Sequence, residues 1–260
     1  MRLAEPVDQA TGLRRLFTPK SAFRALGVLG PDSRVTVRAC VALARGLGRR
    51  GTRVMVLDEA RPPHHVGGLL GILTRHTLAD ATHRGLVDIA QPAGDGIVLL
   101  SAPHGLETLA GLTEADLRDL ADDWHARAEA PEWIVVNGSP RGAELGLAAT
   151  ADDRVLVDGA DAEQARALFT SLEETARRFL GIVPEFLGHL PREKSGSAPA
   201  PMDGNPMDRL AGEPADRPGE ARVDFAQYWQ RMWLHSRMVA ESAGKVTATK
   251  RVRNVRWSSG

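Results

Sequence analysis

The chain has 260 residues, of which 33 are basic and 33 acidic, so its formal net charge at pH 7 is zero. Without excess positive charge it has no long-range field for nucleic acid, and we predict no nucleic-acid partner. The single cysteine, Cys40, excludes an internal disulfide and is typical of a reducing compartment. No apolar run in the sequence is long enough to span a bilayer, so we expect a cytoplasmic protein.

Short apolar runs alternate with longer helical segments between residues 21 and 194. Most of the short runs are continuously apolar, which is typical of parallel strands buried on both faces. The predicted strands are 25–29, 53–57, 96–100, 132–136, 154–157 and 185–187, and the predicted helices are 37–49, 77–84, 114–129 and 161–180. This alternation predicts a doubly wound α/β fold, in which helices flank a mostly parallel sheet.

An N-terminal element, residues 1–20, precedes this domain. Asp8 is a suitable N-cap, and Gln9, Leu13 and Leu16 then share one face of a short helix. Because so short a helix is marginal by itself, we expect it to be disordered when free and helical on a partner.

Residues 30–38 lie where a phosphate-binding loop would join the first predicted strand to the first predicted helix. Such a loop needs glycines whose N–H groups approach phosphate, a lysine for charge, and a Ser or Thr for magnesium. Here Gly30 is followed by Pro31, which lacks an N–H, and by Asp32, which repels phosphate, and the stretch contains no lysine. The pattern predicts a nucleotide-hydrolase fold that no longer hydrolyses nucleotide.

Several further motifs occur in a recognisable order. Asp58 ends the second predicted strand, Val-Gly-Gly-Leu-Leu-Gly occupies 66–71, and Thr-Leu-Ala-Asp occupies 77–80. Residues 8–14 read Asp-Gln-Ala-Thr-Gly-Leu-Arg. This order resembles the MinD/ParA group of P-loop ATPases. More narrowly, it resembles the flagellar-number regulators called FlhG or FleN, whose N-terminal element is Asp-Gln-Ala-x-x-Leu-Arg. The resemblance covers residues 5–191.

The departures from that family define a degenerate nucleotide site made of Gly30, Thr36, Asp58 and Asn137. The family loop, Gly-Lys-Gly-Gly-Val-Gly-Lys-Thr in type, falls on a stretch where only Gly30 is kept and its phosphate-binding lysine corresponds to Thr36. The family's Asp-x-Asp becomes Asp58-Glu59-Ala60, and its magnesium-side aspartate becomes Asn137. Loss of the loop, metal and water-positioning groups together predicts a pseudo-ATPase without cofactor or metal. The chain is also shorter than the family's between Val157 and Asp161, which predicts a truncated form of the fold.

The resemblance also implies a partner. In FlhG proteins the N-terminal element stimulates FlhF, a GTPase related to those of the signal recognition particle. The residues that would bind it are Asp8, Gln9, Ala10, Leu13 and Arg14, with Gln9 helping to position water in the partner's GTP site. A glutamine amide can both donate and accept, so it can orient water without titrating. Taken without the family, the same residues describe only a capped, frayed helix.

The C-terminal part is predicted to be separate from the domain. Residues 195–223 are rich in Pro and Gly and are predicted to be a flexible linker, and 224–260 an amphipathic helix with a basic tail. Its large apolar side chains share one face: Phe225, Tyr228, Trp229, Met232 and Trp233. This face could dock on its own domain, fill a partner's groove, or lie on a membrane as the C-terminal helix of FlhG proteins does. The long linker favours a membrane or a partner.

Three functions follow from these features. The favoured one is a non-hydrolysing FlhG-like regulator that binds and stimulates FlhF and controls flagellar assembly or number. Such a protein would be a monomer or part of a hetero-complex, with the flagellar base as another candidate partner and a peripheral position at the inner membrane or cell pole. The alternatives are a divergent MinD-like ATPase with a rebuilt nucleotide site, and a flagellar transcription anti-activator or adaptor.

The His64-His65 pair is predicted to lie in a solvated loop rather than to bind metal.

Overall fold

The computed structural model describes residues 22–30, 32–138, 146–151, 153–158, 170, 173–174, 177–178, 185–191 and 223–255. The predicted N-terminal element, almost all of the predicted linker, most of the shortened segment at 157–161 and most of the predicted helix 161–180 lie outside these residues. Within the described ranges, none of the helices has the length and apolar character needed to cross a membrane.

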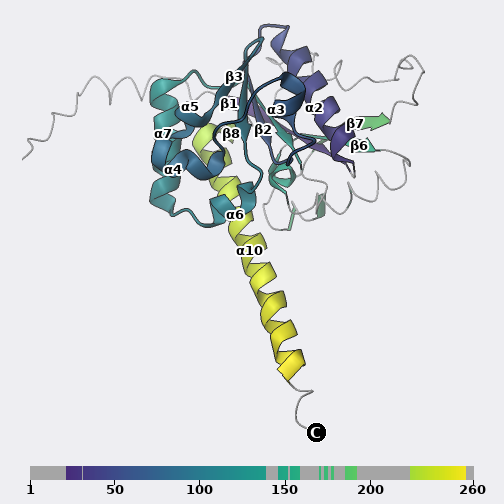
Figure 1. The fold of residues 1–260 in the computed structure, drawn as a ribbon, viewed down its shortest axis with the longest axis vertical. Helices are drawn as coiled ribbons and strands as arrows, with labels where there is room; N and C mark the ends of the chain where they lie inside the picture. The colour runs from purple at the N-terminus through teal and green to yellow at the C-terminus, as the bar shows by residue number, and fades with distance from the viewer. Residues whose placement is uncertain are drawn as a thin grey trace, which may run out of the picture.

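A single sheet forms the centre of the molecule (Figure 1). Its strand order is β3-β4-β2-β5-β1-β6-β7, and β8 pairs with the beginning of β1. The strands are β1 Ala22–Leu29, β2 Val54–Asp58, β3 Gln91–Gly94, β4 Ile97–Ser101, β5 Trp133–Asn137, β6 Asp153–Asp158, β7 Glu185–Pro191 and β8 Val223–Asp224. All pairings are parallel except β3 with β4 and β8 with β1. The mostly parallel α/β sheet is confirmed, and all six predicted strands are present.

Each central strand sends alternate side chains to two separate cores. In β2, Met55 and Leu57 join the core on one face of the sheet, and Val54 and Val56 join the core on the other. Because successive side chains of a strand point to opposite faces, a strand covered on both sides must be apolar at every position. This explains the continuous apolar runs in the sequence.

The helices divide between the two faces. On one face lie α2 Ser33–Gly48 and α3 Val66–Leu70. The other face is covered by η1 Leu78–Asp80, α4 Ala81–Arg84, α5 Leu86–Ile89, α6 Gly105–Ala110, α7 Glu114–Arg127, η2 Leu147–Thr150 and the first turns of α10 Phe225–Val255. Helix α7 begins with a capping box, in which Thr113 Oγ1 accepts from Asp116 N and Asp116 Oδ2 accepts from Thr113 N.

The structure corrects the prediction for the C-terminal helix. Phe225, Tyr228, Trp229, Met232 and Trp233 were expected to face a membrane or a partner, but all five are at most 8% exposed and belong to the main core. Helix α10 runs along α6 and α7 and then extends beyond the body of the domain (Figure 1). Burying a large aromatic side chain stabilises the fold by several kcal/mol. Packing against the chain's own domain removes this whole apolar face from water, so the face needs no other partner.

Aromatic contacts attach α10 to the earliest and middle parts of the chain. Phe23 of β1 makes edge contacts with Phe225 and Tyr228, at centroid distances of 6.2 and 5.3 Å. Trp124 of α7 stacks on Phe225 at 5.5 Å. The indole N–H of Trp233 donates to the carbonyl of Leu112 at 3.0 Å, and the Arg231 guanidinium donates to the carbonyl of Thr150 at 3.1 Å, so hydrogen bonds as well as apolar contacts fix the register of α10.

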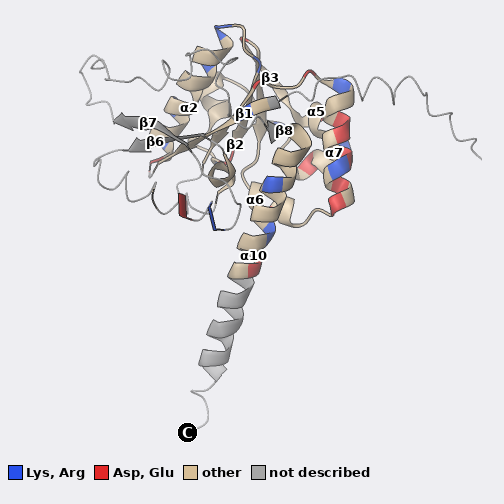
Figure 2. Ribbon diagram, turned by 180° about the vertical axis from the view of Figure 1, so that it is seen from behind, with Lys and Arg blue, Asp and Glu red and all other residues tan. Residues whose placement is uncertain are grey.

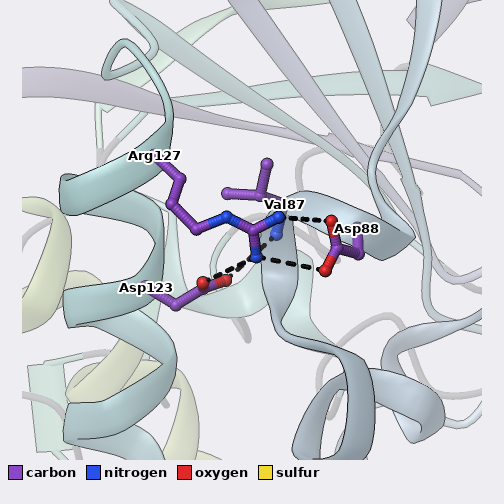
Figure 3. A network of polar contacts seen from close by, with 4 residues as sticks. All are labelled: Val87, Asp88, Asp123 and Arg127. Carbon is purple, nitrogen blue, oxygen red and sulfur yellow. Dashed lines mark hydrogen bonds and ion pairs between the residues drawn. The ribbon is translucent and has the colours of Figure 1, made fainter.

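A network of hydrogen bonds and ion pairs joins α5 to the last turn of α7, on the same face of the sheet as α10 (Figure 3). The Arg127 guanidinium donates to both carboxylate oxygens of Asp88, at 3.1 and 2.5 Å, and to Asp123 Oδ1 at 2.9 Å. The backbone N–H of Val87 donates to the other Asp123 oxygen at 3.4 Å. The Arg127 hydrogen bond lowers the pKa of Asp88. The paired geometry orients the two helices even though exposed ion pairs add little stability.

Candidate functional site

The candidate site lies at the carboxyl ends of β1, β5 and β2, which are adjacent in the sheet. In open α/β sheets ligands bind outside this edge. Asn137, the last residue of β5, is opposite Val28 of β1 on one side and Asp58 of β2 on the other. Gly30 follows β1 directly. The structure therefore brings Gly30, Asp58 and Asn137 to one edge, as the sequence predicted.

The connection from β1 to α2 is too short to be a phosphate-binding loop. β1 ends at Leu29 and α2 begins at Ser33, so only residues 30–32 separate them. Most of the stretch that corresponds to the family loop is therefore helical. A phosphate-binding loop instead places a full glycine-rich segment between strand and helix.

An internal carboxylate occupies the beginning of α2. Asp32 is the N-cap, and its Oδ1 accepts from the backbone N–H of Arg34 at 2.9 Å. The next two N–H groups, of Val35 and Thr36, donate to the Asp32 carbonyl at 3.1 and 3.0 Å. A helix N-terminus attracts anions through its free N–H groups and its dipole. Here Asp32 satisfies those groups from within the chain.

Thr36 also makes its contacts within its own helix. Its side-chain hydroxyl lies 3.2 Å from the carbonyl of Asp32 and 3.1 Å from that of Ser33, and the residue is fully buried. A hydroxyl that donates to carbonyls in this way follows the usual i to i−4 and i−3 pattern of helical threonine. The position that corresponds to the family's phosphate-binding lysine is therefore a packed side chain in the first turns of a helix.

Asp58 is held by three hydrogen bonds. Its Oδ1 accepts from Ala60 N at 3.1 Å and from the side-chain amide of Asn137 at 2.7 Å, and its Oδ2 accepts from Val66 N at 2.7 Å. Burial raises the pKa of Asp58, while these donors act in the opposite direction. Through these bonds Asp58 caps the turn that follows β2 and binds the first residue of α3.

Glu59 is a buried acid that the sequence analysis did not select. It is 5% exposed, and its side chain lies against Gly146, where an added Cβ would be 2.8 Å from Oε2. Burial raises the pKa of Glu59 to about 7, although backbone N–H groups of Leu147 and Ala148 act in the opposite direction. Oε2 has no hydrogen-bond partner among the described residues. Its place directly after a buried strand, beside Asp58, was the signal in the sequence.

The close packing of η2 over the sheet explains the burial of Glu59. Gly27 of β1 lies under this turn, and a Cβ at that position would be 2.6 Å from the carbonyl oxygen of Ala148. Only glycine permits so close an approach of two backbones. The turn therefore lies tightly on β1 and covers the acid from one side.

The remaining predicted site residues are not part of this cluster. Phe225, Trp229, Met232 and Trp233 belong to the core on the α10 face, and the five residues of the N-terminal element lie outside the described ranges. Of the predicted loop histidines, His65 caps α3 by accepting from Gly68 N at 3.3 Å, and His64 Nε2 accepts from Arg34 Nε at 2.8 Å. Among the residues that the structure describes, no three His, Cys, Asp or Glu side chains are placed to hold a metal ion.

We tested whether these residues fit a magnesium nucleotide, as the position of the site in the sheet would suggest. Both carboxylate oxygens of Asp58 are used by N–H donors, the Thr36 hydroxyl faces carbonyls, and the N-terminus of α2 is capped by Asp32. None of Thr36, Asp58, Glu59 and Asn137 is more than 5% exposed. The arrangement offers neither a metal ligand nor an amide nest, so the residues present do not fit that ligand.

No protein-family model matches the sequence, and comparison with curated proteins finds no match. Similar solved structures include cobyrinic acid a,c-diamide synthase from Mycobacterium smegmatis with an ATP analog and magnesium. It is 16% identical with a TM-score of 0.49, and the match covers 84% of this chain and 94% of that one. A ParA family ATPase from Chlorobium tepidum is 17% identical with a TM-score of 0.46, covering 86% and 93%. A plasmid partition protein from Borrelia burgdorferi is 12% identical with a TM-score of 0.44, covering 82% and 96%. These similarities are too distant to transfer an activity to this chain.

Proposed function

We propose that this chain is a regulatory protein that acts by binding other macromolecules and does not hydrolyse nucleotide. The observation that carries the proposal is the beginning of α2, where Asp32 satisfies the N–H groups that would otherwise bind phosphate. A phosphate brought to this point would meet a carboxylate instead of free N–H donors.

The Asp58–Asn137 pair supports the same proposal. A magnesium-bound aspartate needs an oxygen lone pair that reaches the metal, but Asp58 is 1% exposed and accepts three hydrogen bonds within the fold. Displacing one of these donors to admit a metal would leave a buried N–H unpaired, at a cost of about 1–3 kcal/mol. Binding of the metal would have to repay that cost, and the site provides no second ligand to help.

The proposal includes a partner, the FlhF-type GTPase, on the basis of residues 8–14. Their sequence, Asp-Gln-Ala-Thr-Gly-Leu-Arg, resembles the FlhG element that stimulates this GTPase. In this role Gln9 would orient the attacking water, Leu13 would anchor the helix, and Arg14 would pair with a carboxylate or phosphate. The chain would then control flagellar assembly or number without an ATP cycle of its own.

Calorimetry with magnesium-ATP tests the first part. Titration of the full chain should give no binding heat up to a nucleotide concentration of about 1 mM, because the site lacks a free anion nest. A P-loop ATPase of known affinity in the same buffer serves as the positive control. Binding in the micromolar range would contradict the proposal and favour an ATPase with a rebuilt site.

GTP turnover by FlhF tests the second part. The full chain should accelerate turnover, and Gln9→Ala should remove roughly tenfold or more of that acceleration, since misplaced reacting groups cost on the order of a hundredfold. Gln227→Ala, at an exposed position of α10, is the matched control and should stimulate like the wild type. Equal stimulation by Gln9→Ala would show that Gln9 has no role in the partner's site.

A further inference from the structure

A basic surface groove runs along the outer side of α2, next to the end of α3. Its lining residues are Arg38, Val41, Ala42, Arg45 and Arg49 of α2 and its C-terminal turn, together with Leu69 of α3, and the groove encloses about 380 Å³. Positions three, four and seven residues apart lie on one side of a helix, so the three arginines and the two small apolar residues form a single stripe.

The arginines of this groove lack carboxylate partners. Arg38, Arg45 and Arg49 make no ion pair or side-chain hydrogen bond that involves their guanidinium groups within the described part of the chain. Other exposed arginines do: Arg53, Arg118 and Arg127 each pair with a glutamate or aspartate. The difference arises because neither α2 nor α3 contains an acidic residue.

Acidic residues gather instead on α7, which belongs to the other face of the sheet (Figure 2). The protein as a whole is neutral, but α2 carries arginines and no acidic residue, whereas α7 carries both signs with acidic residues in excess. A surface that carries only positive charge attracts negatively charged partners and repels positively charged ones, which determines the rate and specificity of association.

The floor of the groove is apolar and partly open to solvent. Its apolar lining is Val41, Ala42 and Leu69, and Leu69 is 47% exposed. Apolar side chains on the floor have no counterpart in a phosphate backbone, so they favour a protein over a nucleic acid. The three arginines recur along about three turns of one helix, a spacing that suits acidic side chains on one face of a second helix better than a flat lipid surface.

We propose that this groove binds an acidic amphipathic helix of a partner protein. The apolar side of that helix would lie on Val41, Ala42 and Leu69, and its Glu or Asp side chains would pair with the arginines on either side. From Arg38 to Arg49 the stripe extends about 16 Å, which corresponds to about three turns of a partner helix. This surface is independent of the N-terminal element and of the function proposed above.

A designed peptide provides the test. The probe is a fluorescein-labelled 18-residue peptide with Leu at positions i, i+3, i+4 and i+7, Glu at the positions that flank this apolar face, and Ala or Gln elsewhere so that it remains helical, and its binding to the full chain is followed by fluorescence anisotropy. The double substitution Arg38→Gln/Arg45→Gln should weaken binding about tenfold, as expected when two interfacial charge pairs are lost. Arg50→Gln, which removes one positive charge at an exposed position outside the groove, is the control for the general loss of charge and should change the affinity less than about twofold.

A second matched pair tests the apolar floor. Leu69→Gln should weaken binding several-fold, whereas Leu73→Gln, which removes a more exposed leucine outside the groove, should leave it unchanged. Both positions are partly or largely exposed, so neither substitution should disturb the fold.

Two results would overturn the proposal. The first is equal binding of the peptide by wild type and by both groove variants. The second is tighter binding of a 20-base-pair DNA duplex, or of phosphatidylglycerol vesicles, through the same arginines, since that would identify a different class of partner. Binding of a control peptide in which every Glu is replaced by Lys would also count against it.

Discussion

Replacing Trp229 with alanine is expected to lower the free energy of unfolding by about 3–5 kcal/mol. Trp229 is 1% exposed and packs beside Phe225, with ring centroids 5.9 Å apart. Its indole nitrogen has no hydrogen-bond partner among the described residues, so the loss comes from apolar contacts and from the cavity left behind. Urea unfolding monitored by circular dichroism measures the change, which should also reduce the melting temperature by about 10 °C.

Leu234→Ala is the matched control on the same helix. Leu234 is 51% exposed, and its truncation should change the free energy of unfolding by no more than about 0.5 kcal/mol. If Trp229→Ala were as stable as the control, α10 would not be docked in solution. The apolar face of this helix would then be available to a membrane or to a partner protein.

The second large effect is expected for Glu59→Gln at neutral and alkaline pH. Burial raises the pKa of Glu59 from its ordinary value of 4.5 to about 7, so the folded protein retains a proton that the unfolded chain releases. The contribution of Glu59 to stability is therefore greatest below about pH 4.5 and is lost as the pH rises through 7. A shift of this size corresponds to about 3 kcal/mol above pH 8.

Glutamine is neutral at every pH and removes this penalty. The variant should exceed the wild type in stability by roughly 2–3 kcal/mol at pH 8 and by less than about 1 kcal/mol at pH 5. Urea unfolding across this range measures the difference, and Glu241→Gln, an exposed carboxyl on α10, should leave the wild-type pH profile unchanged. An unaltered profile for Glu59→Gln would mean that Glu59 is already ionised and solvated in the folded state.

The strands were predictable because parallel strands covered on both sides have an unmistakable composition. The runs that became β2, β4 and β5 are apolar at nearly every position, and each was placed to within one residue. Strands β3 and β8 were missed for the opposite reason. β3 reads Gln-Pro-Ala-Gly, and it forms because Asp95 and Gly96 adopt positive φ values of 51° and 70° that reverse the chain beside β4.

The position of α10 could not be derived from its amphipathic pattern. The pattern identifies the face that must be covered but not the surface that covers it, and the partners Phe23 and Trp124 are remote in the sequence. The length of the predicted linker favoured a membrane or a partner, but a long linker does not determine which surface the helix packs against.

In the candidate site, the pairing of Asp58 with Asn137 followed from strand order, since both residues end neighbouring parallel strands. The environment of Glu59 did not follow, because the turn η2 that buries it is fixed by the close approach of Ala148 to Gly27. Contacts of that kind depend on backbone geometry and leave only a glycine as a trace in the sequence.

The contact of Phe23 with Phe225 and Tyr228 also has a consequence for biosynthesis. The first strand acquires these aromatic neighbours only after residue 228 has been synthesised. Until then, the nascent chain exposes the apolar surface of its sheet that α10 later covers, and such surfaces attract chaperones or promote aggregation. Pairings between distant parts of a chain also slow folding, so docking of α10 should be a late step in folding.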